Sequence, residues 1–181
     1  MSMKIEVKER GSKEFYDEML YVITYCKKFL KNPRKKAWKY SSYLYLMMAV
    51  SIVMLGVFIA MYLFEKEWYS LVMLGAFTLM LFILLFQLIA IKKRIKMFMD
   101  DGSDKTVEIT SEYIDFSSDT MNLKMKKEEI SVILINKYST CILPKELNKY
   151  SISISNDYLN QFLEGAKEKG YESIIVDNRK K

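Results

Sequence analysis

The sequence of 181 residues is 51% hydrophobic and carries 28 Lys and Arg against 22 Asp and Glu, but it has no histidine. Histidine is the commonest general base and metal ligand, so we expect no catalytic residues, no metal and no cofactor. The net charge of +6 comes from residues 1–39 and 92–99, whereas residues 100–181 are mildly acidic. The C-terminal part therefore lacks the basic footprint of a nucleic-acid-binding domain.

Residues 1–39 predict a strand followed by an amphipathic helix. Residues 4–8 alternate with period two, as a half-buried strand does. Between residues 13 and 31 the apolar side chains share one helical face, with Ser12 as the expected cap and Asn32-Pro33 as the break. Two placements remain open for this helix. It lies in a membrane interface, or it packs on the cytoplasmic domain, which the acidic residues on its polar face favour slightly.

Two uncharged apolar runs follow, residues 40–64 and 68–91, separated by the short loop 65–67. A bilayer core of about 30 Å needs about 20 apolar residues in a helix, and both runs exceed that length. Aromatic residues gather at the ends of the runs, as they do at membrane interfaces. The pattern predicts a transmembrane helical hairpin. Because neither run contains an ionisable residue, it predicts an anchor, and not an ion or proton pathway.

Basic residues flank the predicted hairpin on both sides, whereas the loop between the runs has one. This distribution predicts a multi-pass protein of the cell membrane with both termini cytoplasmic. The same residues are candidates for contact with anionic lipids of the inner leaflet, although setting the topology alone would explain them equally well. They are Lys27, Lys28, Lys31, Arg34, Lys35, Lys36, Lys39, Lys92, Lys93, Arg94 and Lys96.

Small residues in the two runs suggest how the helices pack. Ala49, Gly56 and Ala60 lie on one helical face, and Gly56 and Gly75 are at similar distances from the loop. Small residues allow helix backbones to approach closely in membranes. We therefore expect the two helices to meet at these glycines, or the same face to pair two hairpins in a homo-oligomer.

The region 92–181 has β periodicity and predicts one small domain. Its start, residues 100–104, is acidic and is interpreted as a linker. A helix is expected over residues 156–169, ended by Gly170, and residues 173–176 form a last strand or an extended tail. Several short antiparallel strands followed by one helix predict a small curved sheet whose open side the helix covers. The strands are expected at 106–110, 113–117, 121–125, 131–136, 138–143 and 150–155.

This order of elements resembles the YcxB-like family of small bacterial two-span membrane proteins. The matching stretches are 107–116, 129–135, the run Cys141-Ile142-Leu143-Pro144-Lys145, and 157–169. The resemblance implies an α+β membrane protein with a pleckstrin-homology-like β domain and no established biochemical activity. The chain departs from the family pattern by lacking a tryptophan before Glu129, and it adds residues 150–155 and a tail beyond the helix.

The expected function is that of a membrane-anchored, non-catalytic binding module whose cytoplasmic β domain engages a protein partner. Two alternatives remain: an immunity protein that protects the cell from a toxin or bacteriocin, and an accessory subunit of a transporter or signalling complex. Without reactive groups, exposed turns and strand edges must carry specificity. The candidate partner surface is therefore Lys137 and Tyr138, at a β-turn, with Ser151, Ser153 and Ser155, the polar alternate positions of a strand.

Overall fold

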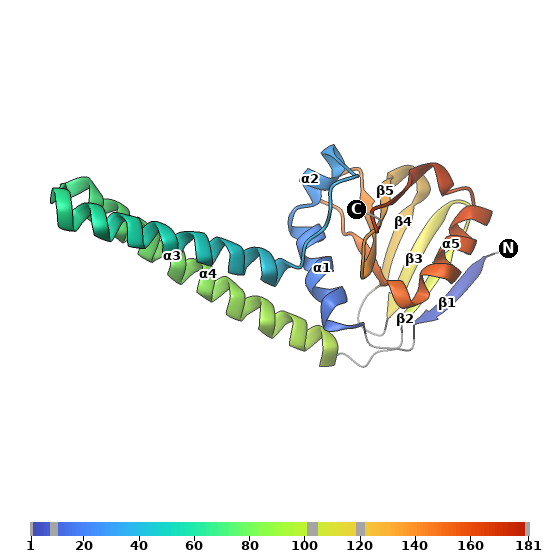
Figure 1. Ribbon diagram of the computed structural model, residues 1–181. Coiled ribbons are helices and arrows are strands. Elements are labelled where there is room, and N and C mark those ends of the chain that lie inside the picture. The colour runs from blue at the N-terminus through green and yellow to red at the C-terminus, as the bar shows by residue number, and fades with distance from the viewer. Residues whose placement is uncertain (1, 8–10, 101–104, 119–121, 180–181) are drawn as a thin grey trace. The chain divides into compact units, whose positions relative to one another are not determined.

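The computed structural model describes residues 2–7, 11–100, 105–118 and 122–179, and its elements are traced in Figure 1. Of the predicted linker 100–104, Asp100 is instead the last residue of a helix, and residues 101–104 lie outside the described residues, as do Lys8 and Met121 at the ends of two predicted strands. The chain divides into two units. We call the first, Met1–Trp38 with Phe98–Lys181, the split domain, and the second, Lys39–Met97, the hairpin.

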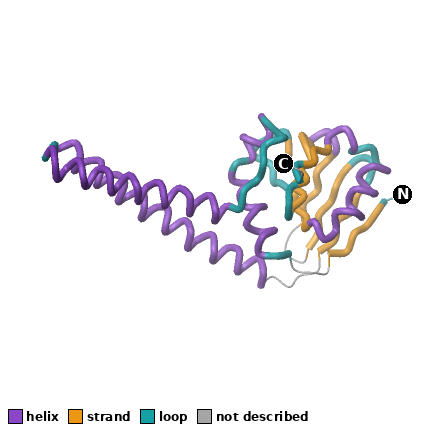
Figure 2. Tube along the Cα trace, viewed as in Figure 1, coloured by secondary structure: helices purple, strands orange, loops and turns teal. Residues whose placement is uncertain are grey.

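The first sheet of the split domain joins residues from both sides of the hairpin. It contains β1 (Met3–Val7), β2 (Lys105–Ile109), β3 (Tyr113–Ser118) and β4 (Asn122–Lys126), all antiparallel and in that order. Five consecutive residue pairs join β1 to β2, so a strand that precedes the hairpin in the sequence pairs with a strand that follows it (Figure 2). The predicted alternation is confirmed, because every second residue of these strands faces the core.

The second sheet contains β5 (Ile130–Ile135), β6 (Ser139–Pro144), β7 (Ile152–Ser155) and β8 (Ile175–Asp177), in the order β7-β6-β5-β8. The expectation of a single curved antiparallel sheet is therefore wrong: there are two sheets, and β8 pairs with β5 in parallel. The reason lies in β5 and β6, which are buried almost throughout. A sheet whose central strands are apolar on both faces needs a packed layer on each side.

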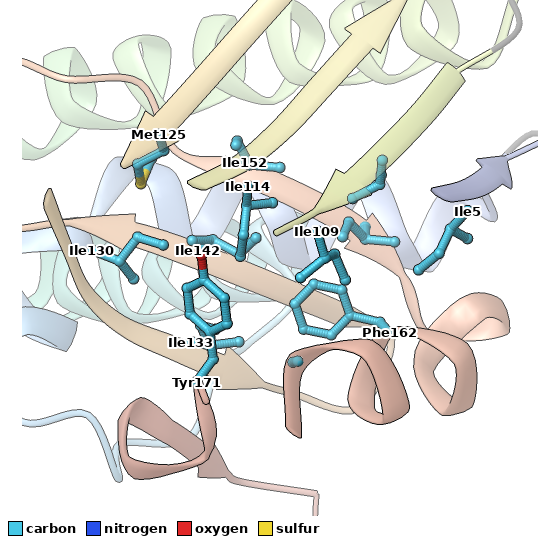
Figure 3. Packing of buried hydrophobic residues seen from close by; sticks show 13 residues of the cluster. Ile5, Ile109, Ile114, Met125, Ile130, Ile133, Ile142, Ile152, Phe162 and Tyr171 are labelled. Carbon is cyan, nitrogen blue, oxygen red and sulfur yellow. The ribbon is translucent and has the colours of Figure 1, made fainter. Parts of the chain in front are cut away.

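The main core lies between the two sheets and is closed by the C-terminal helix α5 (Leu159–Glu168), which follows a short 3-10 turn η2 (Asn156–Tyr158). In Figure 3, Ile109 of β2 lies beside Phe162 of α5, and Ile133 of β5 lies beside Tyr171. Gly170 has a φ of 77° and ends the helix region, as predicted. The 3-10 turn η3 (Glu172–Ile174) then leads into β8.

The N-terminal helix is broken, and the prediction of one helix over residues 13–31 is wrong. The structure has α1 (Lys13–Thr24) and α2 (Cys26–Lys31), with Tyr25 between them at φ −106° and ψ 25°. The change of direction brings Phe29 edge-on to Tyr21, with ring centroids 6.1 Å apart, and leaves Phe29 1% exposed. The predicted cap is confirmed, since the Phe15 N–H donates to Ser12 Oγ at 3.1 Å.

The hairpin contains α3 (Tyr40–Glu65) and α4 (Trp68–Asp100) as far as Met97, and both helices are long and apolar enough to cross a membrane. α4 continues beyond the predicted end at residue 91 and includes the basic residues that follow. The expected contact between the glycines is wrong, because a Cβ added at Gly56 or Gly75 would meet no atom within 4 Å. Larger side chains lie between the helices, since the rings of Phe58 and Phe77 stack 5.6 Å apart. The other two residues of the predicted packing face, Ala49 and Ala60, are exposed.

Candidate functional site

The predicted partner surface falls on two neighbouring parts of the split domain. Lys137 and Tyr138 form the turn between β5 and β6, which the bond from Asn136 N–H to Ser139 O closes at 2.8 Å. Ser151 and Ser153 are half-buried. Ser155 was expected to be exposed but is 6% exposed, because its hydroxyl bonds the carboxylate of Asp157 at the start of the next turn. The predicted turn and strand are therefore both present, but the side chain of Ser155 is not available to a partner.

A buried carboxylate fixes α1 to this turn. Glu18 of α1 is 3% exposed and accepts the N–H groups of Tyr138 and Ser139 at 2.9 Å each, and the Ser139 hydroxyl at 2.8 Å. Burial raises the pKa of Glu18 above its usual value, and the donated hydrogen bonds offset part of that effect. These bonds settle the open placement of the N-terminal helix, because α1 packs against β6 of the split domain.

An apolar groove of about 250 Å³, which we call the β7 groove, lies beside β7 within the split domain. One wall is formed by α1, and the other comes from the first sheet. Its rim carries exposed apolar residues, of which Tyr150 is 76% exposed and Ile23 41% exposed. The residues of the α1 wall are Phe15, Met19 and Ile23, and those of the sheet wall are Val7, Phe116 and Leu123.

The strand presents its edge to this groove. All six consecutive residues from Tyr150 to Ser155 line it, whereas a strand facing a cavity with one side would contribute alternate residues. β7 is also the last strand of its sheet, with β6 on one side. The groove is therefore bounded by main-chain atoms as well as by apolar side chains.

The pairing with β6 shows which main-chain N–H and C=O groups of β7 point toward β6 and which point away from it. The Asn156 N–H donates to Tyr138 O at 3.2 Å, and the register continues as Ile154 with Thr140 and Ile152 with Ile142. In an antiparallel pair, hydrogen-bonded residues alternate with residues whose N–H and C=O groups point outward. The main-chain groups of the intervening residues therefore point away from β6. Within the paired register these residues are Ser153 and Ser155.

The other described sheet edges carry charged side chains. The exposed positions of β4 include Lys124 and Lys126, and β1 carries Lys4 and Glu6. Charges on an edge strand discourage pairing with another chain. The residues of β7 are Ile and Ser, without charge. Among the described edges, β7 is thus the one whose composition least opposes an added strand.

The two cysteines lie near β7, where Cys141 is buried and Cys26 is half-buried, and both thiols have a raised pKa. Ser153 Oγ donates to Cys141 Sγ at 3.4 Å, and Cys141 is fully buried, which raises the pKa of its thiol to about 11. Burial also raises the pKa of Cys26. A nucleophilic cysteine needs the opposite shift. Within the described ranges, no group of three or more acidic or Cys side chains has the arrangement of a metal site.

The eleven candidate lipid-contact residues are divided between the two units. Six lie on α2 and the segment after it in the split domain, and all six are exposed. The other five belong to the hairpin, where Lys39 is half-buried and the four residues on α4 are exposed. The segment after α2 is fixed within the split domain, because the Asn178 side-chain amide donates to Pro33 O at 2.8 Å.

Comparisons with family models, curated proteins and solved structures gave no match for this chain. The resemblance to the YcxB-like family therefore stays a prediction, and the site rests on its geometry.

The α1 wall of the groove was missed by sequence reasoning. Phe15, Met19 and Ile23 belong to the single apolar face predicted for residues 13–31, and nothing in the periodicity separates residues that pack from residues that border a groove.

Proposed function

We propose that this chain is an integral-membrane, non-catalytic binding module, in which the hairpin is an anchor and the split domain engages a protein partner at the membrane. One observation carries the proposal. The hairpin is inserted between β1 and β2, which pair with each other over five residues. The anchor therefore cannot be separated from the domain without dividing its first sheet. A domain confined near a bilayer meets membrane-bound partners at a raised effective concentration.

The proposed topology places both termini in the cytoplasm. Support comes from the eleven basic residues that flank the two runs, against Lys66 alone in the loop. Those on α2, after it and on α4 are exposed, so they are able to contact anionic headgroups. Such contacts contribute roughly 1 kcal/mol per basic residue near the surface.

The proposed domain class is pleckstrin-homology-like. Its support is the chain order of a four-stranded antiparallel sheet, then three further antiparallel strands, then a helix that packs on the core. The hairpin would be an insertion after the first strand, and α1, α2 and β8 would be additions. Binding without turnover is supported by the raised pKa of both thiols and by a site made of apolar side chains and strand edge.

Site-specific photo-cross-linking of the full chain in native membranes tests the proposal. A photoreactive amino acid is placed at the exposed Tyr150 or Leu147 of the split domain, and at the exposed Phe82 or Phe86 of the hairpin. We expect a discrete protein adduct from the domain positions, identified by mass spectrometry. Adducts confined to the hairpin positions would contradict the proposal, because the helices would then carry the interaction.

A further inference from the structure

The β7 groove combines two features: an uncharged strand edge that no other described strand covers, and apolar walls on both sides of it. We infer that it binds an extended, uncharged, apolar segment of the partner protein, which adds to β7 as a further strand of the second sheet. The inference rests on the proposed function, since it names the surface and the kind of segment through which the partner is held. Addition of a strand to a sheet edge is a recurrent mode of peptide recognition.

Directional groups on β7 are the first argument. The register points the N–H and C=O groups of Ser153 and Ser155 away from β6. An added strand would pair with these groups, and main-chain bonds of this kind give affinity without requiring a particular sequence. An acyl chain has no hydrogen-bonding groups, so it would leave the strand edge unsatisfied.

The two walls are the second argument. Successive side chains of an added strand point to opposite faces of the sheet. On one face they would meet Phe15, Met19 and Ile23 of α1, and on the other Phe116 and Leu123 of the first sheet. Side chains on both faces of the added strand would thus contact an apolar wall. This predicts a segment that is apolar at consecutive positions, and not at every second one.

The charge of the lining residues and the volume of the groove restrict the class of ligand further. Lys105 is the one charged residue among the described residues that line the groove. A basic side chain on the segment would lose hydration without gaining a counter-charge from these residues, and an acidic one would have Lys105 alone. The volume of about 250 Å³ is below the roughly 300–1,000 Å³ of small-molecule sites. It suits a few side chains better than a cofactor.

Selection from a phage-displayed library of random heptapeptides, with the full chain in detergent micelles as bait, tests the inference. We expect enriched peptides to be uncharged and rich in Val, Ile, Leu and Phe. A synthetic enriched peptide should bind at least tenfold more weakly once alternate main-chain nitrogens are methylated, because methylation removes strand donors and keeps every side chain. Enrichment of charged peptides, no enrichment, or equal binding of the methylated twin would overturn the inference.

Two variants of the protein locate the binding. Ser153→Pro removes an outward N–H that β6 does not use, and an edge strand tolerates proline at such a position; it should weaken the peptide about tenfold. Ile23→Asp places a charge on the α1 wall and should have a similar effect, whereas the matched Leu147→Asp, on an exposed residue outside the groove, should leave affinity unchanged. Thermal unfolding checks that each variant is folded, and unchanged affinity in a folded Ile23→Asp variant would overturn the inference.

Two other ligands of the groove, a lipid acyl chain and a second copy of this chain, would give different experimental results. Displacement of the peptide by laurate, with equal laurate binding to the wild type and Ser153→Pro, would assign the groove to a lipid chain. Self-association lost in Ser153→Pro, without peptide binding, would assign the edge to a second copy. Either result overturns the inference. A partner still captured from Tyr150 in membranes would leave the proposed function standing.

Discussion

At the scale of single residues, Glu18 does most to hold the candidate site together. Its carboxylate takes three hydrogen bonds from the turn that joins β5 and β6, across 120 residues of sequence. These bonds position α1, and α1 forms one wall of the β7 groove. The three bonds replace part of the hydration that the buried carboxylate has lost, and the remaining cost is why its pKa is raised.

Removing this carboxylate should destabilise the domain in a way that depends on the replacement. Glu18→Ala leaves the main-chain N–H groups of Tyr138 and the buried Ser139 without an acceptor, so we expect a loss of about 1–3 kcal/mol in the free energy of unfolding. Glu18→Gln keeps an accepting oxygen and should lose much less. Urea unfolding of the full chain in detergent measures both. Equal losses for the two variants would show that the bonds to Tyr138 and Ser139 contribute little.

The raised pKa of Glu18 predicts a pH dependence of defined sign. The folded state holds the Glu18 proton more tightly than the unfolded state, whose pKa is near 4.5. The stabilising contribution of this group is thus fully present below pH 4.5, and it is lost as the pH rises through the raised pKa. The unfolding free energy of the wild type, relative to Glu18→Gln, should fall as the pH rises from 4.5. A relative increase over that interval would contradict the raised pKa.

At the scale of elements, local periodicity was sufficient to predict where the strands and the two long helices lie. It was insufficient to predict which elements pair or pack with one another. The alternation in β1 and β2 is visible in the sequence, but nothing local shows that they pair across the hairpin. The parallel β8 and the break at Tyr25 also depend on contacts with distant residues. The groove needs α1, β7 and the first sheet together, so sequence alone reached the β7 strand and not its walls.

In the hairpin, the contact predicted from the spacing of the glycines differs from the contact that the structure shows between Phe58 and Phe77. Gly56→Leu should leave the thermal midpoint of the full chain in detergent nearly unchanged, because a side chain there meets open space. Phe77→Ala should lower it, because it removes the ring that stacks on Phe58; such aromatic pairs contribute about 0.5–1.5 kcal/mol beyond their buried area. A large loss from Gly56→Leu with none from Phe77→Ala would restore the glycine contact.

At the scale of the whole molecule, the domain depends on residues from both sides of the hairpin. Residues 98–181 lack β1, which pairs with β2, and α1, which accepts the turn N–H groups. We expect this fragment to aggregate when it is expressed alone, and to become soluble when residues 1–38 are co-expressed with it. Size-exclusion chromatography distinguishes the two states. A monodisperse, folded fragment 98–181 would show that β1 and α1 are dispensable.

The central claim is that the hairpin spans the membrane and holds the split domain on the inner side. Labelling with a membrane-impermeant maleimide in intact cells tests it most directly, using Glu67→Cys in the loop and Tyr150→Cys on the domain, both at exposed positions. The wild type is the control for Cys26 and Cys141. We predict that Glu67→Cys is labelled in intact cells and Tyr150→Cys only after permeabilisation. Labelling of Tyr150→Cys, and not of Glu67→Cys, in intact cells would contradict the account.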